Sequence, residues 1–501
     1  MAIFPQKNRK QPSRKIYTTK IALKKSHLKK QETMSNTQKI PSNTPNSPNN
    51  TPNTPQNPPK VGIDRITFAT PNCYLSMKDL AIERGIDPNK FTIGIGQSQQ
   101  AVPPNHQDIV TLGAQAALPL MPYIDSSRLK MVIVGTESGV DASKSSALYI
   151  HKLLNLSEWV RCVEVKEACY GGTAALMMAR DYVLAHSGAQ VLVIAADIAR
   201  YGVGTPGEVT QGAGAVAMLV SENPRVLQIN DDSVVKSAEI QDFWRPVYQS
   251  TALARGKFST EQYIRMFCDV WQKYSAENDC NFNDFEAICF HLPYTKMGLK
   301  ALRAGFEANS GVSHACDGVS YTNDGVSLTS DTRERLLARY QDSTQYSRRI
   351  GNIYTGSLYL GLISLLDYDY FRNSCDPSES AGDSSAVTGD SSSATHPNES
   401  PLRLSLLLPG QKIGLFSYGS GAVAEFFSAT LVPGWRSALF SNQHIKALNN
   451  RTQLSVSQYE EMFNSAAPYS PQDFVSSQEN RSGARFVLDS ITSQERNYLS
   501  I

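Results

Sequence analysis

Residues 163–179 read VEVKEACYGGTAALMMA, and this stretch decides the fold class. A run with strand character leads into a turn of small residues, and an alanine-rich helical stretch follows. A second stretch, residues 413–429 (IGLFSYGSGAVAEFFSA), has the same predicted order of strand, glycine-containing turn and helix. Together the two stretches predict a duplicated α/β unit with two similar halves.

Outward from these stretches, apolar runs of strand length alternate with helical stretches from about Val61 to about Val432. Strands are predicted at 131–135, 160–165, 191–196, 215–220, 287–292 and 413–417, and helices at 108–118, 173–186 and 354–370. This alternation predicts an α/β protein whose sheets are buried between layers of helices.

The first 60 residues differ in composition from the rest. Residues 1–31 hold ten Lys and Arg and no Asp or Glu, and residues 35–60 are rich in Asn, Pro, Thr and Ser. Neither part has hydrophobic periodicity, so a disordered extension is predicted over 1–60. Alternatives for the basic part are a mitochondrial transit peptide, translation from Met34, or attraction to phosphates or a membrane surface. A second low-complexity block predicts a surface insertion at 373–400.

Charge and cysteine usage exclude several classes. The net charge of +2 hides a body of residues 32–501 that carries −8, which argues against a nucleic-acid-binding protein. No apolar run is long enough for a transmembrane helix, and no secretory signal is present. The eight cysteines have no zinc-ligand spacing, so no metal site is expected. They indicate reduced thiols in a cytoplasmic protein.

Cys169 is the strongest candidate for a nucleophile. It follows a predicted strand and precedes Gly171, Gly172 and a predicted helix. The positive end of a helix favours a thiolate, and we therefore expect a lowered thiol pKa. The alternative is a small buried residue where strand and helix pack tightly.

Two further candidates follow predicted strands. Glu137 follows the strand at 131–135, where burial would raise a carboxyl pKa and suit a general base. His291 lies near the end of the strand at 287–292, where an imidazole could donate to an oxyanion. The alternatives are a helix-capping glutamate and a core histidine. Ligands bind at the carboxyl edge of α/β sheets, so with Cys169 these groups suit acyl transfer through a covalent thioester.

Lys296 and Lys300 follow in FHLPYTKMGLK. If this segment is helical, the two side chains share one face and could hold phosphates. The alternative is an ordinary solvated helix face.

Many ordered blocks resemble the bacterial type of 3-hydroxy-3-methylglutaryl-CoA (HMG-CoA) synthase, in the thiolase superfamily. The resemblance runs from about Val61 to the C-terminus, with an interruption at 373–400. The blocks include GIDRITFATPNCYL, FTIGIGQSQQAVPPNHQDIVTL, VGTESGVDASKS, VKEACYGGTAAL, ADIARYG, TQGAGAVAML, DFWRP, FHLPYTKMG, GNIYTGSLY and SYGSGAVAEFF.

The resemblance implies a role for each matching residue. Cys169 takes the acetyl group of acetyl-CoA, Glu137 removes a methyl proton, and His291 polarises the acetoacetyl-CoA carbonyl. The backbone N–H groups of Ser420 and Cys169 form an oxyanion hole. The remaining implied substrate-binding residues are Asp197, Tyr201, Thr210, Asp242, Asn352 and Ser420 in the pocket, and Lys296 and Lys300 at the CoA phosphates.

The resemblance also implies a thiolase-like, five-layer αβαβα fold built from two pseudo-equivalent halves. The halves would span 61–228 and 229–433, followed by a C-terminal extension at 434–501. A cytoplasmic homodimer of the mevalonate pathway is expected, with CoA thioesters as substrates and no further cofactor. An alternative is the related enzyme that performs β-branching on chains held by acyl carrier proteins.

Overall fold

The computed structural model describes residues 59–309, 328–374, 404–467, 470–479, 481 and 483–501. Most of the predicted N-terminal extension and most of the predicted insertion at 373–400 lie outside these ranges. The first strand, β1, begins at Val61, which is where the sequence predicts that order begins.

A ten-stranded mixed sheet runs through the described chain in the order β12-β13-β14-β8-β1-β7-β6-β4-β5, and β9 also pairs with β14. The pairs β4–β5, β4–β6 and β12–β13 are parallel. All six predicted strands are present, with boundaries that differ by a few residues. The strands are β1 (Val61–Ala69), β4 (Leu129–Gly135), β5 (Arg161–Val165), β6 (Gln190–Ala199), β7 (Gly212–Glu222), β8 (Leu227–Ile229), β9 (Val234–Ser237), β12 (Ala287–Phe290), β13 (Lys412–Gly419) and β14 (Val423–Leu431).

The helices include the three that the sequence predicts. Asp108 caps the N-terminus of α2, because its side chain accepts hydrogen bonds from the N–H groups of Val110 and Thr111. The helices are α1 (Met77–Glu83), α2 (Ile109–Ala117), α3 (Ser146–Leu153), α4 (Gly171–Ala185), α5 (Gly256–Glu277), α6 (Thr295–Asn309), α7 (Ser330–Ile350), α8 (Ser357–Ser374), α9 (Ser441–Asn449) and α10 (Val456–Asn464). Short helical turns are η1 (Lys90–Ile95), η2 (Leu118–Tyr123), η3 (Glu208–Thr210), η4 (Phe282–Asp284), η5 (Tyr354–Gly356) and η6 (Trp435–Ala438).

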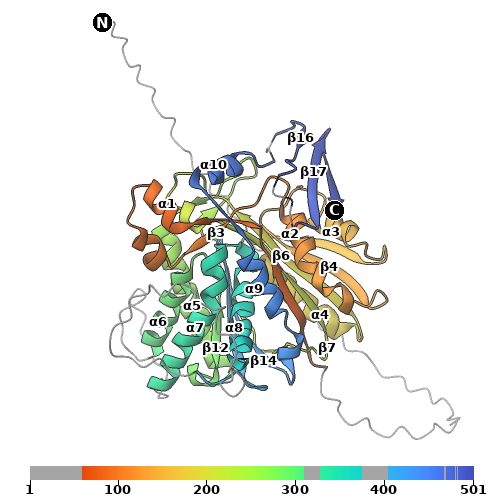
Figure 1. Cartoon of the computed structure of the whole chain (residues 1–501). Coiled ribbons are helices and arrows are strands. Elements are labelled where there is room, and N and C mark those ends of the chain that lie inside the picture. Colours follow the sequence, from red (N-terminus) through yellow and green to blue (C-terminus); the bar gives the residue numbers. More distant parts are fainter. Residues whose placement is uncertain (1–58, 310–327, 375–403, 468–469, 480, 482) are drawn as a thin grey trace, which may run out of the picture. The chain divides into compact units, whose positions relative to one another are not determined.

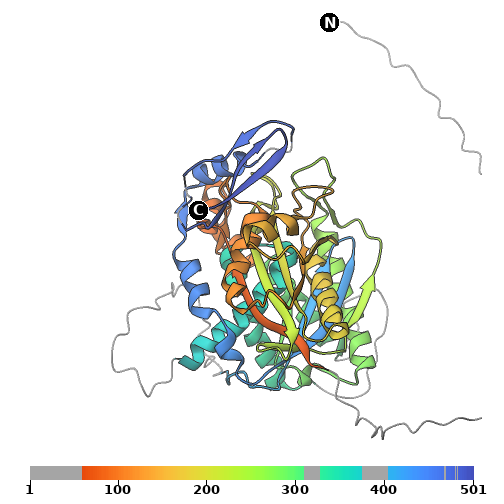
Figure 2. The ribbon, with the colours of Figure 1, turned by 90° about the vertical axis from the view of Figure 1, so that its right-hand side faces the viewer.

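Three smaller sheets complete the described elements. One pairs β15 (Thr452–Leu454), β2 (Cys73–Ser76) and β3 (Gln99–Ala101). Another is the hairpin of β10 (Phe243–Trp244) and β11 (Leu253–Ala254). The third contains β16 (Phe474–Val475), β17 (Phe486–Thr492) and β18 (Glu495–Ser500), and lies near α2 and α3 (Figure 2).

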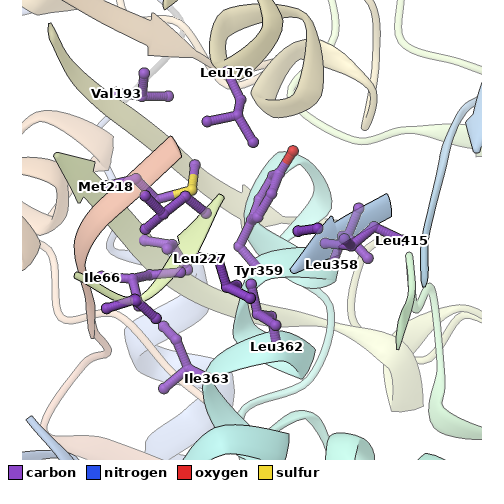
Figure 3. Close-up of a cluster of buried hydrophobic side chains, with 14 of the residues drawn as sticks. Ile66, Leu176, Val193, Met218, Leu227, Leu358, Tyr359, Leu362, Ile363 and Leu415 are labelled. Carbon is purple, nitrogen blue, oxygen red and sulfur yellow. The ribbon is translucent and has the colours of Figure 1, made fainter. Parts of the chain in front are cut away.

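The central core lies between the two parts of the sheet and is built around α4 and α8. Leu176 of α4 and Leu358 of α8 belong to one buried cluster with Val193 and Met218 on one side and Leu415 on the other (Figure 3). Successive strand residues point to opposite faces, so the neighbours of these strand residues face outward from this core.

The outward neighbours pack under two outer layers of helices. Leu192 of β6 packs in a cluster with residues of α2 and α3, whereas Ile288 and Phe290 of β12 pack with residues of α5 and α6. The order is therefore helices, sheet, α4 and α8, sheet, helices (Figure 1). This order confirms the predicted five-layer αβαβα fold.

One predicted element is wrong. The sequence predicts a helix after the turn of residues 413–429, but the structure has a hairpin of the antiparallel strands β13 and β14. Phe426 of β14 faces one core and Phe427 the other. Because β14 is buried on both faces, it has a continuous apolar run that periodicity alone does not distinguish from a helix.

The C-terminal segment is integrated with the layers. Trp435 and Leu448 are buried in the central core, and Phe486 packs with α2. Among the residues that the structure describes, no helix is long and apolar enough to cross a membrane.

Candidate functional site

Cys169 lies in the short connection between β5 and α4. The strand ends at Val165 and the helix begins at Gly171. Gly172 has a steric role, since a Cβ atom there would lie 2.4 Å from the backbone oxygen of Thr355. The absence of a side chain at Gly172 lets η5 approach the helix N-terminus closely. As the sequence predicts, the thiol thus lies at the start of a helix and just past the end of a strand, β5, which is a half-buried strand at the edge of the sheet.

Glu137 is the hydrogen-bond partner of this thiol. It follows the neighbouring parallel strand β4, and Cys169 Sγ lies 3.2 Å from Glu137 Oε1. Burial, and secondarily the nearby Asp197 carboxylate, raise the pKa of Glu137 to about 8. This raised pKa agrees with the sequence prediction.

The prediction of a lowered thiol pKa is not supported. Burial raises the pKa of Cys169 well above its ordinary value, and the Glu137 carboxylate raises it further. Desolvation of the thiolate and the adjacent negative charge outweigh the helix N-terminus, whose influence falls off within one turn. The resting thiol is therefore protonated and needs a proton acceptor, and Glu137 is within hydrogen-bonding distance.

Asp197 supports Glu137 from behind. It is fully buried, and its Oδ1 atom accepts hydrogen bonds from Thr136 Oγ1 at 2.9 Å and from the Glu137 backbone N–H at 3.0 Å. Its Oδ2 atom accepts from the Thr355 N–H at 3.1 Å and from the Thr355 hydroxyl. Both carboxylate oxygens accept hydrogen bonds within the protein, so Asp197 positions the Glu137 loop and η5.

His291 directly follows β12 and is 2 % exposed. Its backbone N–H donates to the Phe416 carbonyl oxygen at 2.8 Å, and its own carbonyl oxygen accepts from the Tyr263 hydroxyl at 2.6 Å. Burial lowers the pKa of the imidazole to about 3. The ring is therefore neutral near pH 7, and it is available as a hydrogen-bond donor without carrying a charge.

A cavity of about 530 Å³, called the main cavity below, brings most of the predicted residues together. Its wall includes Cys169 and His291 and four of the other predicted residues, Tyr201, Thr210, Asn352 and Ser420. The predicted convergence of residues that are far apart in the sequence is thus a feature of the structure.

Asn352 and Tyr201 form one side of this wall. Asn352 Oδ1 accepts from the Tyr354 N–H at 2.8 Å and from Ser357 Oγ at 2.9 Å. This orientation leaves the amide nitrogen of Asn352 as the group that interacts with the Tyr201 hydroxyl.

Ser420 lies in the turn between β13 and β14, and Asp242 holds that turn. The fully buried Asp242 accepts from the Gly421 N–H at 3.1 Å and from the Tyr418 hydroxyl at 2.8 Å. Ser259 Oγ also donates to it, at 3.2 Å. Asp242, like Asp197, therefore acts from behind the wall, whereas Ser420 is on it.

Lys296 and Lys300 lie on α6, which confirms the conditional prediction that their segment is helical. Neither side chain lines the main cavity, although their neighbours Tyr294 and Met297 do. Lys300 Nζ donates to the Tyr294 hydroxyl at 3.2 Å. The structure thus places the two lysines beside the cavity wall, outside the group around Cys169.

The sequence reasoning missed several aromatic residues of the wall. Phe243, Tyr263, Tyr354 and Tyr418 line the main cavity, and the rings of Tyr201, Phe243 and Tyr354 make edge contacts with one another. Three of the missed residues lie within two positions of predicted residues, a proximity that could have indicated them. Tyr263 lies in the interior of α5, where nothing in the sequence distinguishes it from a core residue.

No metal centre is present among the described residues, where no group of three or more His, Cys, Asp and Glu side chains has a suitable arrangement. The six described cysteines are free thiols.

Two family models match the chain. Hydroxymethylglutaryl-coenzyme A synthase N terminal matches residues 57–224, and Hydroxymethylglutaryl-coenzyme A synthase C terminal matches residues 234–374. Together the two models cover more than half of the chain.

Individual relatives agree with these models. The chain is 44% identical over 403 residues to the hydroxymethylglutaryl-CoA synthase of Enterococcus faecalis, which covers 80% of this chain and 91% of the relative. It is 30% identical over 420 residues to a polyketide-biosynthesis 3-hydroxy-3-methylglutaryl-ACP synthase of Bacillus subtilis, covering 80% and 87%. A solved structure of HMG-CoA synthase complexed with CoA has a TM-score of 0.74 and 39% identity, covering 88% of this chain and all of that one.

Proposed function

The chain belongs to the hydroxymethylglutaryl-CoA synthase family of acyl-condensing enzymes, and from that premise we propose its reaction. It condenses acetyl-CoA with acetoacetyl-CoA and water to give HMG-CoA and CoA. The observation that carries the proposal is the Cys169–Glu137 contact of 3.2 Å at a cavity that His291 also lines. A nucleophile, a base and a carbonyl-polarising donor are the groups that this condensation requires.

The first step transfers acetyl to Cys169. The thiol passes its proton to Glu137 as the sulfur attacks the acetyl-CoA carbonyl. The C–S bond to CoA then breaks, and the leaving CoA sulfur takes this proton, which returns Glu137 to its carboxylate form. The backbone N–H groups of Cys169 and Ser420 serve as donors to the thioester oxygen. Asp242 supports this role, because it fixes the turn that carries Ser420 through the Gly421 N–H.

The second step forms the carbon–carbon bond. Glu137 removes a proton from the methyl group of acetyl-S-Cys169, and the resulting enolate attacks the C3 carbonyl of acetoacetyl-CoA. Because burial raises the pKa of Glu137 to about 8, this carboxylate is a stronger base than an ordinary glutamate. Oxyanion donors stabilise the enolate, and one such donor is typically worth about 10²–10³ in rate.

His291 polarises the C3 carbonyl and protonates the alkoxide that forms. The proton that Glu137 took from the methyl group then replaces the one that His291 gave, so both groups regain their starting forms before hydrolysis. Burial lowers its pKa to about 3, so the group that acts is a neutral imidazole. Asn352, Tyr201 and Thr210 contact the acetoacetyl group from the cavity wall. Water then hydrolyses the thioester to Cys169 and releases HMG-CoA.

The proposal also covers CoA binding, the oligomeric state and the metabolic pathway of the enzyme. Lys296 and Lys300 on α6 bind CoA phosphates beside Tyr294. The enzyme works as a homodimer in the cytoplasm, in the mevalonate pathway of isoprenoid biosynthesis. Its substrates are CoA thioesters, and the reaction needs no further cofactor.

A carrier-protein acceptor is the second candidate, because the Bacillus subtilis relative is named a polyketide biosynthesis 3-hydroxy-3-methylglutaryl-ACP synthase. The higher identity to the Enterococcus faecalis enzyme, 44% against 30%, favours the CoA substrate.

One assay tests both candidates. Purified protein is mixed with acetyl-CoA and acetoacetyl-CoA, thiol release is followed, and the product mass is measured. HMG-CoA is expected, and a parallel reaction with acetoacetyl-ACP is expected to be slower. Absence of HMG-CoA would contradict the main proposal, and product formed only from the ACP substrate would favour the carrier-protein acceptor.

A further inference from the structure

A second cavity, of about 250 Å³ and called the side cavity below, is lined by residues that directly follow Glu137 in the chain. Ser138, Gly139 and Val140, which directly follow Glu137, line it. The residues at the end of β6, Ile198 and Arg200, form a further part of its wall. The side cavity is therefore lined by the segment that follows Glu137 and by the end of β6.

The β10–β11 hairpin contributes to the walls of both cavities. Phe243 and Leu253 of the hairpin line the main cavity, whereas Arg245 and Ser250 line the side cavity. The positive charge of Arg245 also acts on the Glu137 carboxyl group. Arg245 of this hairpin thus both lines the side cavity and acts on the proposed base, Glu137.

The side cavity is suited to holding water. Arg200, Arg245 and Arg496 line it together with Asp108. Gln107 also lines it, and Gln107 Oε1 is buried without a hydrogen-bond partner among the described residues. A polar cavity of about 250 Å³ has room for several waters, each of which needs two to four polar partners.

The last step of the proposed reaction, hydrolysis of the thioester to Cys169, needs a water molecule. After condensation, the acyl chain on Cys169 continues into a CoA thioester, so the CoA arm occupies the main cavity. Hydrolysis then requires one water at the carbon bonded to Cys169 Sγ. Glu137 Oε1 lies 3.2 Å from that sulfur, so a water held at Glu137 is within reach of the carbon.

We propose that the side cavity holds the hydrolytic water and delivers it past Glu137 while the CoA arm fills the main cavity. This inference rests on the proposed function. In the step, the water oxygen bonds to the thioester carbon and the C–S bond to Cys169 breaks. The water proton passes to Glu137 and then to the Cys169 sulfur, which leaves a free thiol and the carboxyl group of HMG-CoA.

Filling the side cavity tests the inference. Ala466 lines it, whereas the neighbouring Ser465 is exposed and does not. Ala466→Phe is compared with Ser465→Phe as a control of equal bulk. Both purified proteins are mixed with acetyl-CoA and acetoacetyl-CoA, quenched at intervals and weighed as intact proteins by mass spectrometry.

We expect Ala466→Phe to be acetylated at the normal rate and then to accumulate the HMG-CoA adduct on Cys169. Its kcat is expected to fall at least about tenfold. Ser465→Phe is expected to behave as the unmodified protein. Ser250→Phe, which fills the same cavity from the hairpin, should reproduce the adduct if Ala466→Phe does not fold.

Normal turnover without the adduct in a folded, cavity-filled variant would overturn the inference, and so would a loss confined to acetylation. Failure of the proposed function has a different signature, in which the unmodified protein itself yields no HMG-CoA.

Discussion

Cys169 Sγ donates a hydrogen bond of 3.2 Å to Glu137 Oε1, which joins the ends of the adjacent parallel strands β4 and β5. The two groups act as a pair, because the Glu137 carboxylate disfavours the thiolate, whereas the hydrogen bond from the thiol lowers the pKa of Glu137. Burial, with the Glu137 carboxylate, raises the pKa of the thiol, and burial, with Asp197, raises the pKa of Glu137 to about 8. The reactivity of the thiol therefore depends on the protonation state of its partner.

Removing either member of this pair should separate the chemical steps. Cys169→Ser is expected to abolish the acetyl-enzyme. Glu137→Gln is expected to acetylate more slowly but to lose condensation by about 10²–10⁴ or more, the usual worth of a general base. Incorporation of radiolabelled acetyl-CoA and release of thiol measure the two steps. Equal labelling of the two variants would contradict this division of roles.

The pH profile should report the base. Glu137 must be ionised to accept a proton, so kcat/KM is expected to rise with pH through about 8. Arg245 is a cation that acts to lower the pKa of Glu137, so Arg245→Gln is expected to move the rise to higher pH. Arg245→Lys keeps the charge and serves as the control. An identical profile in all three proteins would rule out this electrostatic role.

Two buried histidines should make the protein sensitive to acid. Burial lowers the pKa of His291 to about 3 and that of His106 to about 4, both from 6.5. Below pH 6.5 the native state therefore binds fewer protons than the unfolded state. The two neutral histidines contribute fully to the free energy of unfolding above pH 6.5, and this contribution is lost as the pH falls from 6.5 towards their folded pKa values. Denaturant unfolding of the unmodified protein and of His106→Gln measures it, and the variant is expected to have the weaker pH dependence. An equal dependence in both would show that His106 has no such effect.

Asp242 should affect rate through the Ser420 turn. Asp242→Ala leaves the Gly421 N–H and the Tyr418 hydroxyl without their acceptor, and each unsatisfied buried group costs about 1–3 kcal/mol. We expect a lower kcat and lower stability, with acetyl labelling of Cys169 slowed. Asp242→Asn retains one acceptor oxygen, so its kcat and stability should lie between those of the unmodified protein and those of Asp242→Ala. A large effect on KM for acetyl-CoA with an unchanged kcat would instead indicate a direct substrate contact.

Gly172 should tolerate no side chain. An added Cβ would meet the Thr355 backbone oxygen at 2.4 Å, so Gly172→Ala is expected to destabilise the protein by about 1–3 kcal/mol. At Gly94 the nearest atom would be 3.8 Å away, which makes Gly94→Ala the matched control. Thermal unfolding compares them, and an unchanged Tm for Gly172→Ala would show that η5 can move away.

Glu137, Cys169 and His291 can be singled out from the sequence because they share one local signal, a position at or just past the end of a predicted strand. The roles of Asp242 and Tyr263 had no comparable signal. Asp242 holds a turn about 180 residues away in the chain, through Gly421, and such long-range hydrogen bonds leave no mark in a local pattern. The helix predicted after Ser420 fails for a related reason, because the partners that make β14 a strand are themselves distant in sequence.

The strand β8 pairs with β1 on one side and with β14 on the other, so it joins the two parts of the large sheet. Cys169 and Glu137 belong to the first part, and His291 and Ser420 to the second. Consequently, a fragment that ends after β7 would expose an unpaired sheet edge and an incomplete wall around Cys169. During refolding, activity should therefore return only with the last long-range strand pairing, which makes enzyme activity a marker of complete folding.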